Sequence, residues 1–300
     1  MIDAPGCYAI PIAEYLNDPC PVASFSASIG KTLMQMSPLH AWLEHPRLGN
    51  TGSMHSEVKA DFGSVVHELV LGNGSEYRIL DVPDFRTKAA KEERDAAIAA
   101  GLTPIKAIDF VRAEDAAKSI REELTSVLAE GEAERTLVWR DGLAWCRARP
   151  DWMVRNSSLI YDLKLTGVNM SPHENTLQRH IFTQWFDMTV AHYADGYLSL
   201  FDKELIDYVF LFVEDHPPFS IRPFKISGQG REMGDRKLRA ARAWWKSCMA
   251  KESWPGMPLQ LEIADPEPWH AAGWLTYDDG PSEIETALAL EMQAPLENAK

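Results

Sequence analysis

The chain has 300 residues and a formal net charge of −14, and 45% of its residues are hydrophobic while 25% are charged. That composition is ordinary for a globular protein with a sizeable core, and no apolar run approaches the roughly 18 residues of a membrane span. A non-specific nucleic-acid coat would normally be basic, so the acidic balance argues against that class and leaves only local or metal-assisted contacts with nucleic acid.

The N-terminus and the cysteines favour a cytoplasmic protein. Met1-Ile2-Asp3-Ala4-Pro5 has no basic region and no long apolar stretch, so no signal peptide is expected. The four cysteines, at positions 7, 20, 146 and 248, include no Cys-x-x-Cys pair. We therefore expect four reduced thiols, and the spacing gives no support to an iron–sulfur cluster.

Helical patterns dominate the first half of the chain. Ser26-Ala27-Ser28 is typical of a helix start, and Ser37-Pro38 ends that helix. Apolar residues then recur at helical spacing between Phe62 and Val70, which predicts an amphipathic helix. The elements expected here are helices at 26–36, 61–71, 88–100 and 113–129 and a short strand at 77–82.

The second half begins with strands. Asp141-Gly142 between two β-rich runs predicts a hairpin of strands at 136–140 and 143–147, with the second strand extended to 155. Asn156-Ser157-Ser158 then turns the chain into a strand at 159–165. The elements expected after it are a helix at 174–199, a strand at 208–214, a helix at 231–250 and a short helix after the capping box Ser282-x-x-Glu285.

This order of elements predicts an α/β (α+β) fold with a central mixed β-sheet flanked by helices. We expect three parts. An N-terminal helical segment at 1–50 packs on a core at 51–265, and a tail at 266–300 carries the short helix.

Two carboxylates and a lysine converge on the second hairpin. A turn at Asn156-Ser157 places Asp151 opposite Asp162, and Lys164 shares the face of Asp162 because residues i and i+2 lie on one side of a strand. Opposed carboxylates repel each other, and a bound divalent cation such as Mg²⁺ offsets that repulsion. The alternative is a solvated strand face with an ordinary Asp–Lys pair.

A histidine on the amphipathic helix supplies an independent element. Gly63 and His67 are separated by four residues and so lie on one helix face, where the glycine allows close approach of a ligand or backbone. A neutral imidazole can complete a carboxylate metal site. The alternative is a buried histidine of the core, but beside the carboxylate hairpin the ligand role is the better interpretation.

The ordered set Gly63-x-x-x-His67, Arg149-Pro150-Asp151 and Asp162-Leu163-Lys164 resembles the PD-(D/E)xK nuclease superfamily in its RecB-like branch. It is most similar to the exodeoxyribonuclease VIII family of phage and prophage recombination exonucleases. The resemblance covers residues from about 20 to 270 and includes Tyr193-Ala194-Asp195-Gly196-Tyr197. Alignment on Tyr193 puts Thr189 where the family's Gln-x-x-x-Tyr motif has glutamine, a residue thought to position substrate.

The resemblance implies the PD-(D/E)xK nuclease fold and a Mg²⁺-dependent exonuclease, with Mn²⁺ as a substitute, that degrades linear double-stranded DNA from 5′ to 3′. It further implies 3′ single-stranded tails for a single-strand annealing recombinase, a homo-oligomeric ring around DNA, and a phage or prophage protein in the bacterial cytoplasm with no membrane partner. The metal ligands would be His67, Asp151, Asp162 and the backbone carbonyl of Leu163, while Lys164 orients the attacking water.

Four residues are candidates for substrate binding. Arg147 and Arg149 lie beside Asp151 in the sequence and would share its strand face, so they are expected to contact phosphate. Tyr193 and Thr189 are further candidates through the motif described above. A stripe of basic residues at helical spacing either lines a DNA channel or is a solvated helix face; it consists of Arg236, Arg239, Arg242 and Lys246.

Two other functions remain open. Another DNA nuclease of the same superfamily, either an endonuclease or a single-strand exonuclease, would use the same site chemistry. A non-catalytic DNA-binding or scaffold protein on a nuclease fold belongs to a different class, and Thr189 in place of glutamine motivates it.

Overall fold

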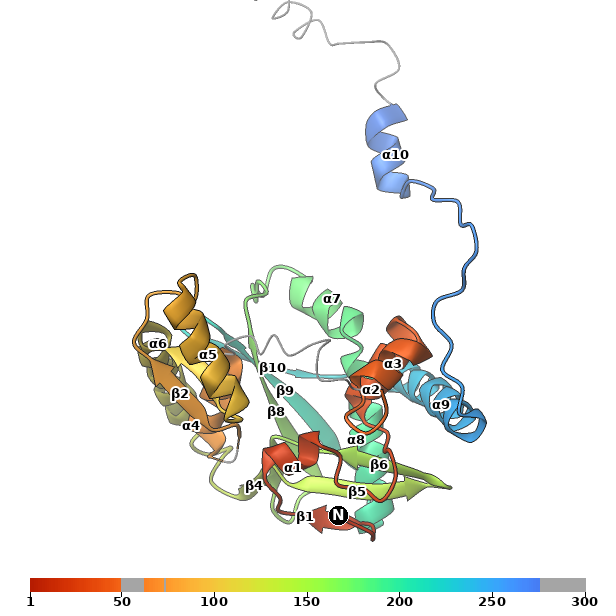
Figure 1. Cartoon of the computed structure of the whole chain (residues 1–300), viewed down its shortest axis with the longest axis horizontal. Helices are drawn as coiled ribbons and strands as arrows, with labels where there is room; N and C mark the ends of the chain where they lie inside the picture. Colours follow the sequence, from red (N-terminus) through yellow and green to blue (C-terminus); the bar gives the residue numbers. More distant parts are fainter. Residues whose placement is uncertain (50–61, 73, 276–300) are drawn as a thin grey trace, which may run out of the picture. The chain divides into compact units, whose positions relative to one another are not determined.

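A five-stranded mixed sheet forms the centre of the computed structural model, which describes residues 1–49, 62–72 and 74–275 (Figure 1). The strand order is β10-β9-β8-β7-β4, and only the β8–β9 pair is parallel. The strands are β4 (Gly131–Ala133), β7 (Trp152–Val154), β8 (Leu159–Thr166), β9 (Asp207–Glu214) and β10 (Ile221–Lys225). The predicted α/β class with a central mixed sheet is therefore confirmed.

Helices cover both faces of this sheet. Alternate residues of β8 and β9 point to opposite faces and pack against different helices. Leu163 and Leu211 face α4 (Phe62–Leu71) and α6 (Ala107–Glu123). Ile160 and Phe210 face α7 (Thr176–Thr183) and α8 (Phe186–Phe201). Figure 1 shows the first pair of helices on one side of the sheet and the second pair on the other.

A second sheet of three strands has the order β1-β5-β6. Its apolar face packs on α8 and on two more helices, with Trp139 fully buried in the shared core. The elements of this region are β1 (Gly6–Tyr8), α1 (Ile12–Leu16), α2 (Ala27–Gln35), α3 (Pro38–Glu44), β5 (Thr136–Asp141), β6 (Ala144–Ala148) and α9 (Gly228–Lys251).

A small parallel pair of strands completes the first unit, Met1–Met257. It consists of β2 (Tyr77–Leu80) and β3 (Thr103–Lys106), which are joined through α5 (Lys88–Ala99). The second unit, Pro258–Lys300, is described as far as residue 275 and contains α10 (Pro268–Leu275). Among the described residues, no helix combines the length and the apolar character needed to span a bilayer.

Local signals located several elements correctly. The Ser26 hydroxyl accepts a hydrogen bond from the Ile29 amide and so begins α2 as predicted. The helix expected at 61–71 is α4, the strand expected at 208–214 is β9, and the helix expected at 231–250 is α9. Asp61, the first residue of the helix expected at 61–71, and the capping box at Ser282 fall outside the described residues.

Two predicted elements are wrong. The single helix expected at 174–199 is two helices, because Trp185 adopts a left-handed conformation with φ of 53° and ends the regular hydrogen bonding between α7 and α8. The single strand expected from 143 to 155 is also two elements. At Pro150 the chain leaves the three-stranded sheet and enters the five-stranded one as β7.

Candidate metal centre and active site

The β7–β8 hairpin has the predicted register. Trp152 pairs with Tyr161 and Met153 pairs with Ile160, so the next position along places Asp151 beside Asp162. The Asp151 carboxylate also accepts a 2.7 Å hydrogen bond from the Leu163 amide, which fixes it against β8. Turn geometry alone was sufficient to predict that Asp151 and Asp162, eleven positions apart, lie side by side.

His67 reaches the same place from helix α4. This helix packs on the face of β8 that carries Leu163, opposite to the face that carries Asp162. Its Nε2 lies 2.7 Å from the Leu163 carbonyl oxygen, and its Nδ1 lies 3.8 Å from Asp151 Oδ2. In its neutral form the imidazole presents a lone pair either to the Leu163 carbonyl, through Nε2, or to the Asp151 carboxylate, through Nδ1. Two electron-rich atoms facing each other at this separation favour a cation between them.

Glu134 is a third donor that the sequence patterns did not predict. It lies between β4 and β5 in a left-handed conformation with φ of 56°, and its amide donates to the Asp151 carbonyl at 3.0 Å. Ligand atoms of His67, Glu134 and Asp151 all lie within 4.8 Å of one another. A non-glycine residue rarely adopts this backbone conformation, and such residues concentrate at functional sites.

Asp162 lies beside these three donors but is held by other partners. Lys164 Nζ donates to Oδ1, and the Tyr208 hydroxyl donates to Oδ2 at 2.5 Å. Burial by itself would raise the pKa of Asp162, but the Lys164 ammonium and the Tyr208 hydroxyl outweigh it and lower that pKa. The lysine and the tyrosine thus keep this carboxylate ionised at neutral pH.

The pKa values of the two neighbouring carboxyl groups are shifted in the opposite direction. Burial, and then the nearby Asp162 charge, raise the pKa of Asp151 well above its ordinary value. Burial also raises the pKa of Glu134, against the effect of Arg149. Ionising both of these acids costs free energy in this position. A bound cation would offset that cost.

The donor set fits a hard divalent cation. Mg²⁺ takes oxygen ligands at about 2.1 Å, so two of its ligands lie roughly 3 to 4 Å apart, as Asp151 and His67 do. The carboxylates of Asp151 and Glu134, the His67 imidazole and the Leu163 carbonyl would supply the protein ligands. Lys164 lines the same cleft of about 310 Å³, together with Gly63 and Ser64.

Arg147 and Arg149 do not lie on the surface of this cleft. They were expected to share a strand face with Asp151, but the break at Pro150 makes that premise wrong, and the two residues are 4% and 6% exposed. Arg149 donates to Glu134 at 2.6 Å and to Thr136 at 3.0 Å. Its guanidinium therefore holds Glu134 in place.

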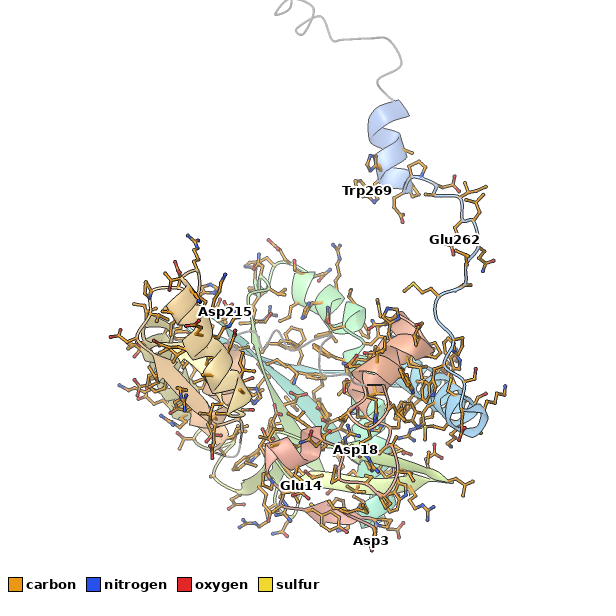
Figure 2. All side chains as sticks on the ribbon, in the orientation of Figure 1. Asp3, Glu14, Asp18, Asp215, Glu262 and Trp269 are labelled. Carbon is orange, nitrogen blue, oxygen red and sulfur yellow. The ribbon has the colours of Figure 1, made fainter. Side chains whose placement is uncertain are left out.

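Arg147 belongs to a separate buried network around Asp18, which Figure 2 labels. Its guanidinium lies 3.2 Å from Asp18 Oδ1, and Ser24 donates to the same carboxylate through both its amide and its hydroxyl at 2.8 Å. Burial would raise the pKa of Asp18, but bonds from His45, Arg147 and Ser24 lower it far below its usual value. This network fastens the N-terminal segment to β6.

The Tyr193 hydroxyl bonds the protein backbone. It donates to the Arg149 carbonyl at 3.1 Å and accepts from the Arg149 amide, so it fixes the corner that leads into Pro150 and Asp151. Thr189, one turn earlier on α8, is 8% exposed, and its hydroxyl finds no partner among the described residues. Gln184 is exposed at the end of α7. Substrate roles for Tyr193 and Thr189 remain predictions.

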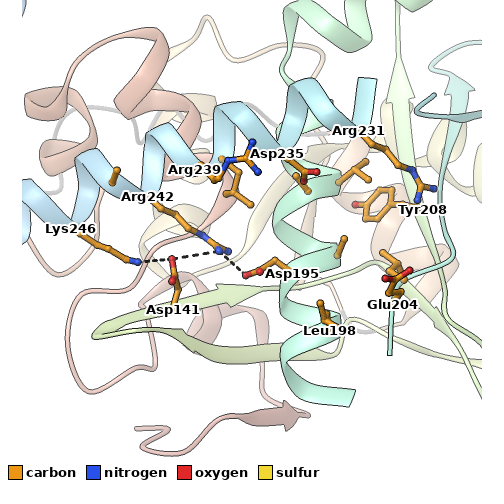
Figure 3. Close-up of a pocket in the computed structure, with 16 residues that line it drawn as sticks. Asp141, Asp195, Leu198, Glu204, Tyr208, Arg231, Asp235, Arg239, Arg242 and Lys246 are labelled. Atoms are coloured by element: carbon orange, nitrogen blue, oxygen red, sulfur yellow. Dashed lines mark hydrogen bonds and ion pairs between the residues drawn. The ribbon is translucent and has the colours of Figure 1, made fainter. Parts of the chain in front are cut away.

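The basic stripe of α9 is largely neutralised. Figure 3 shows a cavity of about 760 Å³ between α8 and α9, in which Arg242 pairs with Asp195 at 2.6 Å and Lys246 pairs with Asp141 at 2.7 Å. Acidic groups thus alternate with the basic ones along this wall. The solvated-face interpretation accounts for Arg236, which is exposed and pairs with Glu232 on its own helix.

One solved structure has a related fold, and another matches the chain more weakly. A presumed exonuclease from Eubacterium rectale superposes with a TM-score of 0.59 at 12% identity, over 88% of this chain and 98% of that one, which is a likeness of fold alone. A phage-related exonuclease from Haemophilus somnus 129PT matches 68% of this chain and 88% of its own, at 11% identity. Its TM-score of 0.31 is too low to bear on the fold.

No protein of curated function matches the chain. A family model does, over residues 31–264, and its description is a PDDEXK-like domain of unknown function, DUF3799. That span contains His67, Glu134, Asp151, Asp162 and Lys164, the residues that the fold brings together. The predicted superfamily is therefore confirmed: the chain belongs to the PDDEXK-like DUF3799 family and has the fold of the PD-(D/E)xK nucleases.

Proposed function

We propose that the protein is a metal-dependent deoxyribonuclease that hydrolyses phosphodiester bonds at the His67–Glu134–Asp151 cluster. The observation that carries the proposal is the convergence of three donors with the Leu163 carbonyl, beside the Asp162–Lys164 pair. A solvated strand face would not place a histidine, a high-pKa carboxyl group and a lysine around one cleft, with a second high-pKa carboxyl group within ligand distance of the first.

The residues of the chain divide the work of hydrolysis. A divalent cation, when bound, neutralises phosphate charge and makes water a better nucleophile near neutral pH. His67, Glu134, Asp151 and the Leu163 carbonyl would hold it. The Lys164 ammonium, oriented by Asp162, donates to the attacking water or to a phosphate oxygen and stabilises the charge that develops there.

Tyr208 and Tyr193 act as positioning residues. Tyr208 holds Asp162 from the side away from Lys164, and Tyr193 holds the backbone at Arg149. Both hydroxyls are buried, and a fixed geometry of this kind lowers the reorganisation that the reaction requires.

The first experiment incubates end-labelled linear duplex DNA with the protein and Mg²⁺, with Mn²⁺ in a parallel series. Asp162→Ala and Lys164→Ala should each reduce the cleavage rate by at least about 100-fold, as the loss of one charge-stabilising group does in other enzymes. Asp115→Ala and Lys118→Ala, at exposed positions of α6, are matched controls that should cleave normally. Undiminished cleavage by either site variant would refute the site.

The finer features of the proposal come from the resemblance to recombination exonucleases. They are 5′→3′ degradation of linear duplex, 3′ tails offered to a single-strand annealing recombinase, and a ring of several subunits in a bacterial cytoplasm. A ring would also gather the few unpaired basic groups of an acidic chain into one channel. Loss of a 5′ label before a 3′ label tests the direction, and sedimentation tests the assembly.

A superfamily endonuclease or a single-strand exonuclease is the second candidate. It would use the same metal donors and the same Asp162–Lys164 pair. Nicking of closed circular DNA, or faster loss of single strands than of duplex, would favour it. A scaffold without catalysis predicts metal binding by calorimetry with no cleavage of any of these substrates.

A further inference from the structure

Lys31 is a partly buried cation on α2 that faces the active side of the central sheet. Its ammonium lies over the Phe186 ring, 4.7 Å from the ring centre. Phe186 stacks on Phe210 at 5.3 Å and lies 6.2 Å from Phe212. None of the family motifs described above includes this lysine.

The aromatic rings connect Lys31 to the reactive residues. In the parallel β8–β9 pair, Asp162 is in register with Phe210, and Lys164 is in register with Phe212. Neighbours in register point to the same face of a sheet. Phe186 therefore lies over the strand next to Asp162 and Lys164, and Lys31 lies above that ring.

The charge of Lys31 has no carboxylate within ion-pair distance in the part of the chain that the structure describes. Burial, and then repulsion from Lys164, lower the pKa of Lys31 to about 8, against the weaker attraction of Asp162 and Asp187. Lys237 offers a contrast. It lies in the same way over the Trp185 ring, at 4.6 Å, but both oxygens of Asp187 bind its ammonium.

A partly buried cation that is repelled by a second cation is stabilised when an anion binds. A nucleic-acid backbone carries one phosphate anion at every nucleotide. A strand whose scissile phosphate lies at the metal donors would bring its adjacent phosphate toward this face of the sheet. One strand would therefore supply both the phosphate at the metal donors and the phosphate at Lys31.

We propose that the Lys31 ammonium binds the backbone phosphate adjacent to the scissile one. This inference rests on the proposed nuclease function. The contact is electrostatic and reads no base, so it should contribute equally on every sequence. It should also contribute one released counterion to the salt dependence of binding.

The test measures binding of a fluorescent duplex by anisotropy, with Ca²⁺ in place of Mg²⁺ to prevent cleavage, across a series of NaCl concentrations. Loss of one phosphate contact lowers the slope of log Kd against log salt by about 0.9. Lys31→Met should show that loss, whereas Lys31→Arg should keep most of the wild-type slope. Lys118→Met, at an exposed position of α6, should keep all of it.

The outcomes separate this inference from the nuclease proposal. An unchanged slope in Lys31→Met, or an equal loss in Lys118→Met, overturns the Lys31 contact while cleavage by the wild type stands. A wild type that binds with the expected slope but cleaves nothing in Mg²⁺ overturns the nuclease proposal alone. A wild type that binds no DNA overturns both. A thermal melt of each variant verifies that it is folded.

Discussion

Tyr208→Phe removes one hydroxyl from the most enclosed hydrogen bond of the site. Tyr208 is 1% exposed, Asp162 is 4% exposed, and the two oxygens lie 2.5 Å apart. Water cannot replace the lost donor in so closed a position, and a hydrogen bond to a charged group contributes about 1.5–3 kcal/mol. Lys164 still holds the other oxygen. We therefore expect the free energy of unfolding to fall by about 2 kcal/mol at pH 7.

The matched control is Tyr193→Phe, whose hydroxyl donates to the neutral Arg149 carbonyl at 3.1 Å. A neutral acceptor predicts a loss of about 1 kcal/mol. Urea unfolding in EDTA, followed by tryptophan fluorescence, measures both variants without metal. A Tyr208→Phe penalty no larger than that of Tyr193→Phe would refute the argument that this bond is charge-assisted.

The same prediction has a pH dependence of known sign. The pKa of Asp162 is lowered in the folded protein, so the stability that its ionised form contributes is fully present above the unfolded pKa of about 4. That contribution is lost as the pH falls through the folded pKa. The Tyr208→Phe penalty should therefore be constant from pH 7 to about 5 and decrease below about pH 4. A penalty that grows in acid would contradict this reasoning.

Three further predictions concern other contacts. Asp18→Asn removes the charge opposite buried Arg147, so the free energy of unfolding at pH 7, measured in urea, should fall by about 3 kcal/mol. The difference from the wild type should become smaller below about pH 4, because the pKa of Asp18 is lowered in the folded protein. Gly196→Ala places a Cβ 2.8 Å from the buried Trp139 ring and should cost about 1–3 kcal/mol in the same assay. Glu134→Gln should weaken Mn²⁺ binding by at least about 10-fold in calorimetry.

Each of these has its own contrary result. A stable Asp18→Asn variant would mean that the two Ser24 oxygens are sufficient partners for the Arg147 guanidinium. A neutral Gly196→Ala would mean that the Trp139 ring can move. Wild-type Mn²⁺ affinity in Glu134→Gln would remove Glu134 from the donor set, leaving His67 and Asp151 as the core of it.

The sequence predicted those parts of the site whose geometry is local. A tight turn sets the register of β7 and β8, and so the meeting of Asp151 with Asp162 could be worked out from numbering alone. Helical spacing set the face that carries His67. These relations depend on one turn and one helix, and no distant packing is needed to establish them.

Glu134 could not be predicted in this way. It is one of several acids in a charged stretch, and it reaches the site because its linker lies antiparallel beside the linker that ends at Asp151. The break at Trp185 is equally hidden, since neither glycine nor proline interrupts the apolar pattern there. Pro150 did carry a signal against a continuous strand, and that signal was outweighed by the β-rich residues on either side.

The pairing of these two linkers has a consequence for the order of folding. Glu134 and Asp151 each lie where the chain passes between the two sheets, and His67 comes from a helix on the far face of β8. No single sheet can assemble the three donors, so the ion-binding state forms only when all these layers have docked. A cation at 100 times its Kd would then add about 2.7 kcal/mol to global stability. Hydrogen exchange should then slow in both sheets together, which would make a bound ion a reporter of complete tertiary assembly.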